Sequence, residues 1–222
     1  LKREGCMKQY IDISVPVSND IPVWEGDPKV EIRAAASIAA GDMANVSFLN
    51  MGAHTGTHID APVHFVQGRK GVDSIAVDRL IGETVVVDFG DLEGEIRYED
   101  FERMNIPAGT KRLLCKTRNS QLWTLYPNRF YKDFIGVSDS GARWVVEHGI
   151  DVLGVDYLGV ERFDSVARGA PTHHRLLEAE VIIIEGLNLT AVEPGSYELI
   201  CLPVRMKNLD GSPCRAILVK ED

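Results

Sequence analysis

The stretch from Met51 to Phe65 places three of the six histidines of the chain, together with one aspartate, within eleven positions. These residues are His54, His58, Asp60 and His64. In a straight strand, at roughly 3.3 Å per residue, the first two histidines would lie about 13 Å apart, too far to share one metal ion. A helix would bring them together, but the threonines and glycine between them disfavour a helix, and Pro62 follows. We therefore predict a bent, partly extended loop.

The same stretch contains residues that allow such a bend. Two glycines would let the backbone fold so that His54 approaches His58 and Asp60. The proline would then fix the exit direction and leave His64 near the ion without necessarily binding it. A single histidine is more often a hydrogen-bonded core or surface residue. Four such residues at spacings of 4, 2 and 4 instead favour a metal site.

A second group of potential ligands comprises His173, His174 and Glu185. Glu185 follows the apolar run Val181 to Ile184, so it would emerge at the carboxyl end of a strand, where open α/β sheets commonly bind ligands. His173 and Glu185 could then reach the first cluster. They could equally be a solvated histidine and an ordinary carboxylate at a strand end, and spacing alone does not decide.

Imidazoles and carboxylates without a thiolate suit Zn²⁺, Mn²⁺ or a similar divalent ion. Three protein ligands would leave a position open for water, which is typical of a catalytic site, and Asp60 could bridge to a second ion. A bound ion can activate water and polarise a carbonyl group, which points to hydrolysis of an amide or ester. His64 is then the candidate acid and base, or alternatively a further ligand.

The composition is that of a globular protein, with 222 residues, 45% hydrophobic and 26% charged. The formal charge of -9 and the lack of a basic run argue against nucleic acid or an anionic membrane as partner. No apolar run approaches the roughly 18 residues of a membrane span. Four cysteines without a CxxC pair suggest a reduced, cytoplasmic setting. We expect one domain over residues 7–222, with residues 1–6 a possible extension before Met7.

Hydrophobic periodicity predicts an α/β fold. Four apolar runs are typical of buried strands: Thr84 to Phe89, Arg112 to Lys116, Val152 to Asp156 and Val181 to Ile184. Three stretches are typical of helices: Ser74 to Leu80 ended by Gly82, Tyr98 to Met104, and Gly141 to His148. The tail should form two strands around a turn at Asp210 to Pro213. Trp24, on a proline-rich arm, could line a pocket or fill a core.

The residues from His54 to Phe65, His-Thr-Gly-Thr-His-Ile-Asp-Ala-Pro-Val-His-Phe, resemble the signature of the metal-dependent cyclase-like hydrolases. This family includes bacterial kynurenine formamidases and isatin hydrolases. The resemblance extends over nearly the whole chain through weaker motifs: Pro22 to Pro28, Lys116 to Ser120, Gly154 to Tyr157, His173 to Leu177, Glu185 to Leu187, and Pro203 to Leu218. In one segment, Asp156 to Glu161, the chain is more similar to the general cyclase-type members than to the formamidases.

The resemblance implies a mixed α/β fold of the swivelling β/β/α type, assembled into homodimers or homotetramers. It implies one ion bound by His54, His58 and Asp60, with Asp60 bridging to a second ion bound by His173 and Glu185. It further implies that His64 is the catalytic acid and base and that Trp24 contacts substrate.

The activity expected on these grounds is that of an arylformamidase-like amidohydrolase, with N-formylkynurenine, an intermediate of tryptophan catabolism, as the leading substrate. Hydrolysis of a cyclic amide such as isatin, or a lyase-like cyclase reaction, is the alternative within enzymes. If the chain is not an enzyme, the alternative is a non-catalytic metal-binding protein with His64 as a fourth ligand.

Overall fold

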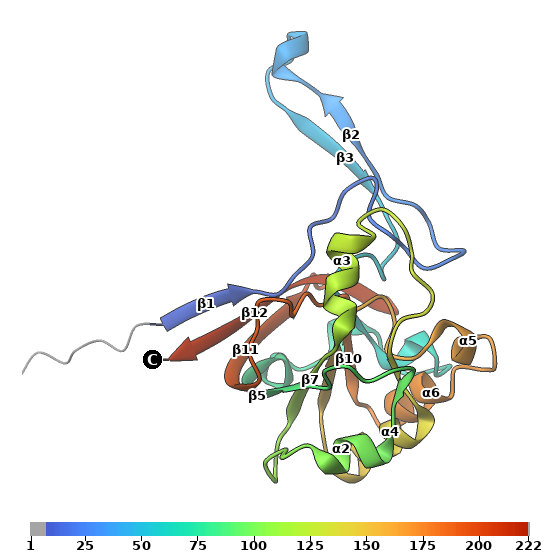
Figure 1. The fold of residues 1–222 in the computed structure, drawn as a ribbon. Coiled ribbons are helices and arrows are strands. Elements are labelled where there is room, and N and C mark those ends of the chain that lie inside the picture. The colour runs from blue at the N-terminus through green and yellow to red at the C-terminus, as the bar shows by residue number, and fades with distance from the viewer. Residues whose placement is uncertain (1–7, 222) are drawn as a thin grey trace, which may run out of the picture.

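The computed structural model describes residues 8–221, so the possible extension at residues 1–6 lies outside the described residues. An eight-stranded mixed sheet forms the centre of the molecule (Figure 1). Its strands lie in the order β1-β12-β11-β5-β7-β9-β10-β4. An additional pairing between β4 and β12 closes the sheet into a barrel-like ring, with β1 outside it. The strands of this sheet are β1 (Lys8–Asp12), β4 (His58–Asp60), β5 (Ile81–Asp88), β7 (Arg112–Lys116), β9 (Val152–Val155), β10 (Ile182–Glu185), β11 (Gly195–Pro203) and β12 (Gly211–Glu221). Two small sheets pair β2 (Glu31–Ala36) with β3 (Val46–Asn50) and β6 (Glu95–Ile96) with β8 (Gly136–Val137).

The predicted α/β class with a mixed sheet is confirmed. β5, β7, β9 and β10 run parallel, and the other pairings of the large sheet are antiparallel. The run Arg112 to Lys116 forms β7 as expected, and β9 and β10 lie within one residue of their predicted bounds. These strands are continuously apolar because both faces are covered.

Alternate residues of the parallel strands enter two separate cores. Leu113 of β7 and Leu153 of β9 pack against α2 (Tyr98–Arg103), α4 (Asp139–Glu147) and α6 (Pro171–Glu178) on the outside of the sheet. Leu114, the next residue of β7, points instead to the inside of the ring, with side chains from β4, β10, β11 and β12. The remaining helices are short: α1 (Val77–Leu80), α3 (Leu122–Leu125) and α5 (Phe163–Val166).

The helix predicted from Ser74 to Leu80 is wrong in extent. A 3₁₀ helix covers Val72–Ser74, and α1 follows from Val77 to Leu80. The chain then enters β5 directly, so that Gly82 lies within a strand and does not end the helix. The last carbonyls of α1 are satisfied by Arg112, whose guanidinium donates to the carbonyl oxygens of Asp78 and Arg79.

The turn predicted at Asp210 to Pro213 is also misplaced. Gly211, Ser212 and Pro213 are the first residues of β12 and pair with β4. The turn-forming composition of this segment is overridden because the same residues close the ring.

The β2–β3 hairpin projects from the body of the molecule (Figure 1). Most of its residues are exposed. Among residues 8–221, five of the eleven exposed large hydrophobic side chains belong to the hairpin: Ile38, Met43, Val46, Phe48 and Leu49. Over the same residues, the helices are too short or too polar to cross a bilayer.

Candidate metal centre

The histidine stretch forms the predicted bent segment, and a short buried strand follows it. Residues 51–57 form a loop in which Gly56 adopts φ +65°, and β4 begins at His58. Thr57 fastens the loop, because its hydroxyl donates to the carbonyl oxygen of Gly186 at 2.6 Å and accepts from the Val15 amide at 2.9 Å. His58 and Asp60 are alternate residues of β4 and share one face of it.

The first group of potential ligands comprises His54, His58 and Asp60. Their ligand atoms all lie within 4.8 Å of one another. His54 Nδ1 lies 2.8 Å from Asp60 Oδ1, and His58 Nε2 lies 3.5 Å from the same oxygen. His54 Nε2 in turn lies 2.9 Å from Asp210 Oδ2, so a nitrogen of His54 could bind an ion only by giving up one carboxylate contact.

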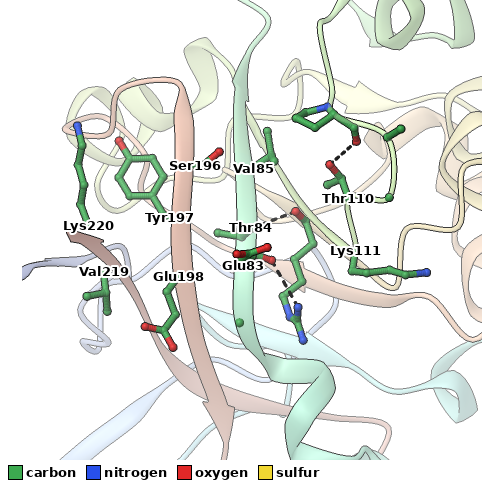
Figure 2. Close-up of a pocket in the computed structure, with 15 residues that line it drawn as sticks. Glu83, Thr84, Val85, Thr110, Lys111, Ser196, Tyr197, Glu198, Val219 and Lys220 are labelled. Atoms are coloured by element: carbon green, nitrogen blue, oxygen red, sulfur yellow. Dashed lines mark hydrogen bonds between the residues drawn. The ribbon is translucent and has the colours of Figure 1, made fainter. Parts of the chain in front are cut away.

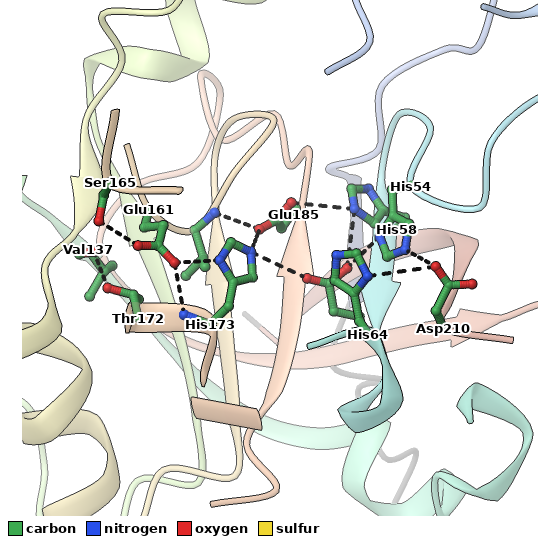
Figure 3. A network of polar contacts seen from close by, with 12 residues as sticks. His54, His58, His64, Val137, Glu161, Ser165, Thr172, His173, Glu185 and Asp210 are labelled. Atoms are coloured by element: carbon green, nitrogen blue, oxygen red, sulfur yellow. Dashed lines mark hydrogen bonds and ion pairs between the residues drawn. The ribbon is translucent and has the colours of Figure 1, made fainter. Parts of the chain in front are cut away.

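The second group comprises Asp60, His173 and Glu185, all buried, and it shares Asp60 with the first. Figure 3 shows His173 and Glu185 side by side. His173 Nε2 lies 3.4 Å from Glu185 Oε1 and 3.9 Å from Asp60 Oδ2. Glu185 ends β10 beside β4, and His173 is carried in by α6, which begins at Pro171. His174 belongs to neither group among the described residues.

Two unpaired atoms indicate that these residues fit a cation. Within the described part of the chain, His58 Nε2 and Asp60 Oδ2 are the buried side-chain polar atoms without a hydrogen-bond partner. Such groups are costly to bury unless something else satisfies them. His58 Nδ1 lies 2.9 Å from the carbonyl oxygen of Gly56 and would donate to it, so that in the neutral ring Nε2 carries the lone pair available to an ion. Nitrogen and carboxylate donors of this kind suit Zn²⁺ or Mn²⁺.

The protonation of these groups follows from burial and from the pairing of charges. Burial opposes protonation of His58 and His173, but the attraction of the nearby carboxylates outweighs it. The pKa of His58 is therefore raised well above its usual value, and that of His173 is raised to about 10. Burial would raise the pKa of Asp60, but the adjacent His54 holds it well below its usual range. Without an ion, protons on the imidazoles thus balance the buried carboxylates.

His64 lies beside the first group on the 3₁₀ helix Pro62–His64. Its ring stacks on that of His54, with the centroids 3.9 Å apart, and its Nδ1 lies 3.7 Å from Asp210 Oδ2. Its side chain is 25% exposed, against 1% for His58 and 6% for His173. Burial lowers the pKa of His64, so its ring is neutral at neutral pH and able to accept a proton.

Trp24 lies in an aromatic cluster, with ring centroids 5.1 Å from Phe130 and 5.3 Å from Phe163. It is partly exposed. A Cβ on Gly159 would lie 2.9 Å from its ring, and the next residue, Val160, donates its amide to Glu185 Oε1 at 2.6 Å. The aromatic cluster is thus connected to the second group through two consecutive residues.

A groove of about 770 Å³ lies elsewhere, across β5, β11 and the loop before β7 (Figure 2). Its lining includes Glu83, Lys111 and Lys220, which are exposed side chains of mixed charge, and none of the candidate ligands. The chemistry of the buried histidines and carboxylates, not the size of this groove, identifies the candidate site.

Two residues of the centre were not anticipated from the sequence. Asp210 was assigned to a turn, yet its carboxylate contacts His54 and faces His64. Glu161 was noted only within a family motif, yet its buried carboxylate accepts a hydrogen bond from His173 Nδ1 at 2.6 Å. Both are distant in sequence from the ligands they touch, so no local spacing could indicate them.

Comparisons with known proteins confirm the family resemblance. The family described as "Putative cyclase" matches residues 11–162. Cyclase-like protein 3 of Oryza sativa subsp. japonica is 36% identical over 220 residues, which cover 96% of this chain and 80% of that protein. Kynurenine formamidase of Bacillus thuringiensis subsp. konkukian (strain 97-27) is 35% identical over 211 residues, which cover 95% and 97% of the two chains. A solved structure described as "The Structure Of Potential Metal-Dependent Hydrolase With Cyclase Activity" superposes with a TM-score of 0.82 at 31% identity and covers 97% of this chain and 100% of that one. This chain belongs to the cyclase family.

Proposed function

We propose that the chain is a metal-dependent amidohydrolase that cleaves a small aromatic amide, with N-formylkynurenine as the leading substrate. The observation that carries the proposal is the pair of largely buried ligand groups that share Asp60, with His58 Nε2 and Asp60 Oδ2 unpaired. The similarity to a bacterial kynurenine formamidase supports the choice of substrate.

The residues that would hold the metal are His54, His58 and Asp60 at one position and Asp60, His173 and Glu185 at the other. A divalent ion bound there would lower the pKa of water and polarise a carbonyl oxygen. Burial strengthens this effect, because the charges are screened little by solvent.

His64 is suited to move the proton. Its Nδ1 faces Asp210, which leaves Nε2 as the nitrogen available to the reaction. Nε2 would accept a proton as water adds to the amide carbon. It would then donate that proton to the nitrogen as the C–N bond breaks, giving an amine and a carboxylic acid.

Trp24 and its aromatic neighbours would hold the aromatic part of the substrate. The partial exposure of Trp24, and its contact with the segment that carries Val160, support this role. Aromatic surfaces of this kind bind flat rings through stacked or tilted contacts.

The experiment that tests the proposal combines elemental analysis of the purified protein with a substrate screen in the presence of Zn²⁺ and Mn²⁺. The screen should contain N-formylkynurenine, simpler aryl formamides, isatin as a cyclic amide, and an aryl ester. Hydrolysis of the formamides is expected, and preferential opening of isatin would favour the cyclic-amide alternative. If protein with metal bound hydrolysed none of these compounds, the proposed hydrolase would be contradicted.

We further propose that the protein works as a homodimer or homotetramer, in which a second copy of the chain covers the β2–β3 hairpin. An isolated two-stranded hairpin is marginally stable, and this one exposes apolar side chains such as Val46 and Leu49. The variant Val46→Lys/Leu49→Lys should reduce the mass measured by light scattering, whereas Val77→Lys, at an exposed apolar position on α1, should not. An unchanged mass in the hairpin variant would contradict this arrangement.

A further inference from the structure

The carboxylate of Glu161 is fully buried, yet it belongs to none of the groups of potential metal ligands within residues 8–221. Its Oε1 accepts two hydrogen bonds from one residue, from the backbone amide of His173 at 3.0 Å and from His173 Nδ1 at 2.6 Å. Its Oε2 accepts from the hydroxyl of Ser165 at 2.6 Å. All the partners of this buried charge therefore serve to hold it against His173 (Figure 3).

The contact determines which nitrogen of His173 faces the candidate site. Because Nδ1 donates to Glu161, Nε2 is the atom turned toward Glu185 Oε1 and Asp60 Oδ2. The plane of the ring is fixed as well, since Phe65 stacks on it with the centroids 4.3 Å apart and the rings 25° from parallel. His173 is thus oriented before any ion arrives.

The segment that carries Glu161 positions the other ligand too. The amide of Val160 donates to Glu185 Oε1 at 2.6 Å. The backbone of Glu161 packs so closely on Gly136 that a Cβ there would lie 2.8 Å from the Glu161 Cα. Two consecutive residues on a fixed backbone therefore hold the side chains of His173 and Glu185.

We propose that Glu161 is a positioning residue, which orients His173 and strengthens it as a ligand at the position shared by Asp60, His173 and Glu185. The inference rests on the proposed metal site and deepens it. A carboxylate that accepts the outer N–H of a ligating imidazole fixes the tautomer and makes the other nitrogen a better donor, and the loss of such a partner weakens metal affinity about 10- to 100-fold.

The test compares Mn²⁺ and Co²⁺ binding by the full chain in four forms: wild type, His173→Ala, Glu161→Gln and Glu161→Asp. His173→Ala identifies the binding event that depends on this position, because it should abolish that event. Glu161→Gln keeps the size of the side chain but removes its charge. The glutamine variant should weaken the His173-dependent binding of metal about 10- to 100-fold and shift the visible absorption of bound Co²⁺. Glu161→Asp keeps the charge at shorter reach, and it should lose less affinity than the glutamine variant.

The outcomes separate the two proposals. If Glu161→Gln binds both ions as tightly as wild type while His173→Ala does not, the role of Glu161 is overturned and the metal site stands. If wild type binds no ion, or His173→Ala leaves binding unchanged, the metal position itself is wrong and the role of Glu161 is overturned with it. Should Glu161→Gln fail to fold, as measured by circular dichroism, Glu161→Asp decides: weakened binding supports the inference and wild-type binding overturns it.

Discussion

Asp60 presents its two carboxylate oxygens to different partners. Oδ1 lies 2.8 Å from His54 Nδ1, whereas Oδ2 lies 3.9 Å from His173 Nε2 and has no hydrogen bond. Residues close together in the sequence thus form one half of the centre, and α6 and β10 supply the other half. The spacing of the histidines indicated the first half, but the contribution of His173 depends on tertiary packing that spacing does not reveal.

His64 is the residue whose replacement best separates catalysis from metal binding. Under the proposed mechanism, His64→Ala should lower kcat about 10²- to 10⁴-fold, because proton transfer is lost. The metal content should stay at the wild-type level, because His64 is not one of the residues proposed to hold the ions. His64 does form a third possible group of ligands with His54 and Asp210, and this variant therefore also tests whether that group binds metal. His174→Ala is the matched control, since His174 lies near the site but outside those groups, and it should keep both activity and metal. A fall in metal content in His64→Ala would instead support the non-catalytic alternative.

Metal uptake should depend on pH. In the metal-free protein the pKa of His58 is raised well above its usual value and that of His173 to about 10, so both rings hold a proton at neutral pH. An ion must displace these protons, so metal affinity should increase as pH rises toward about 10 and decrease as pH falls. Calorimetry in buffers of different ionisation enthalpy should detect release of about one proton from each of the two histidines. Binding without proton release would contradict the assignment of a proton to His58 and to His173 in the metal-free protein.

At the scale of elements, the loop before β4 and the end of β10 approach each other very closely. Gly186 adopts φ +72°, and a Cβ there would lie 2.1 Å from the carbonyl oxygen of Gly56. Gly186 also accepts the hydrogen bond from Thr57, so this contact sets the distance between His58 and Glu185. The geometry of the metal centre therefore depends on a glycine that is not a ligand.

Gly186→Ala should consequently both destabilise the fold and weaken metal binding. The left-handed backbone costs a non-glycine residue about 1 to 3 kcal/mol, and relief of the clash costs a similar amount. Gly90→Ala is the matched control, because Gly90 also adopts a left-handed conformation, at φ +56°, but a Cβ there would meet nothing within 4 Å. Urea denaturation should give a larger loss of unfolding free energy for Gly186→Ala than for Gly90→Ala. Equal losses of unfolding free energy in the two variants would show that the close approach of Gly186 to Gly56 adds nothing to the cost of the substitution.

The elements differ in how well the sequence predicted them, and the reason is physical. β7, β9 and β10 have continuous apolar runs because both faces are buried, so their periodicity is unambiguous. α6 was missed, although Pro171 stands at its first turn, because His173 and His174 interrupt the apolar pattern. The start of β12 was taken for a turn because its pairing partner, β4, lies about 150 residues away in the chain.

At the scale of the whole molecule, the candidate ligands lie next to the seam where the ring closes. β4 carries His58 and Asp60 and pairs with β10 on one side and β12 on the other. Asp210, just before β12, contacts His54 across this seam. An ion bound there would therefore connect the loop before β4, β4 itself, α6 and β10 beside this seam.

Metal should accordingly stabilise the whole fold. At a free ion concentration about 100-fold above Kd, binding adds about 2.7 kcal/mol to the free energy of unfolding. For a chain of this size that corresponds to an increase in Tm of about 5 to 10 °C. Differential scanning calorimetry with Mn²⁺ or Zn²⁺, compared with chelator, should detect it, and Asp60→Asn should abolish the increase. A Tm that stays unchanged with both ions would contradict the claim that metal binding stabilises the fold.

The most direct measurement is the anomalous diffraction of crystals grown with Zn²⁺ or Mn²⁺, recorded at the absorption edge of the metal. We predict a peak within about 2.0 to 2.2 Å of His58 Nε2 and a carboxylate oxygen of Asp60, and a second beside His173 Nε2 and Glu185 where two ions bind. An ion bound elsewhere on the chain, with these side chains left unligated, would contradict the proposed metal centre.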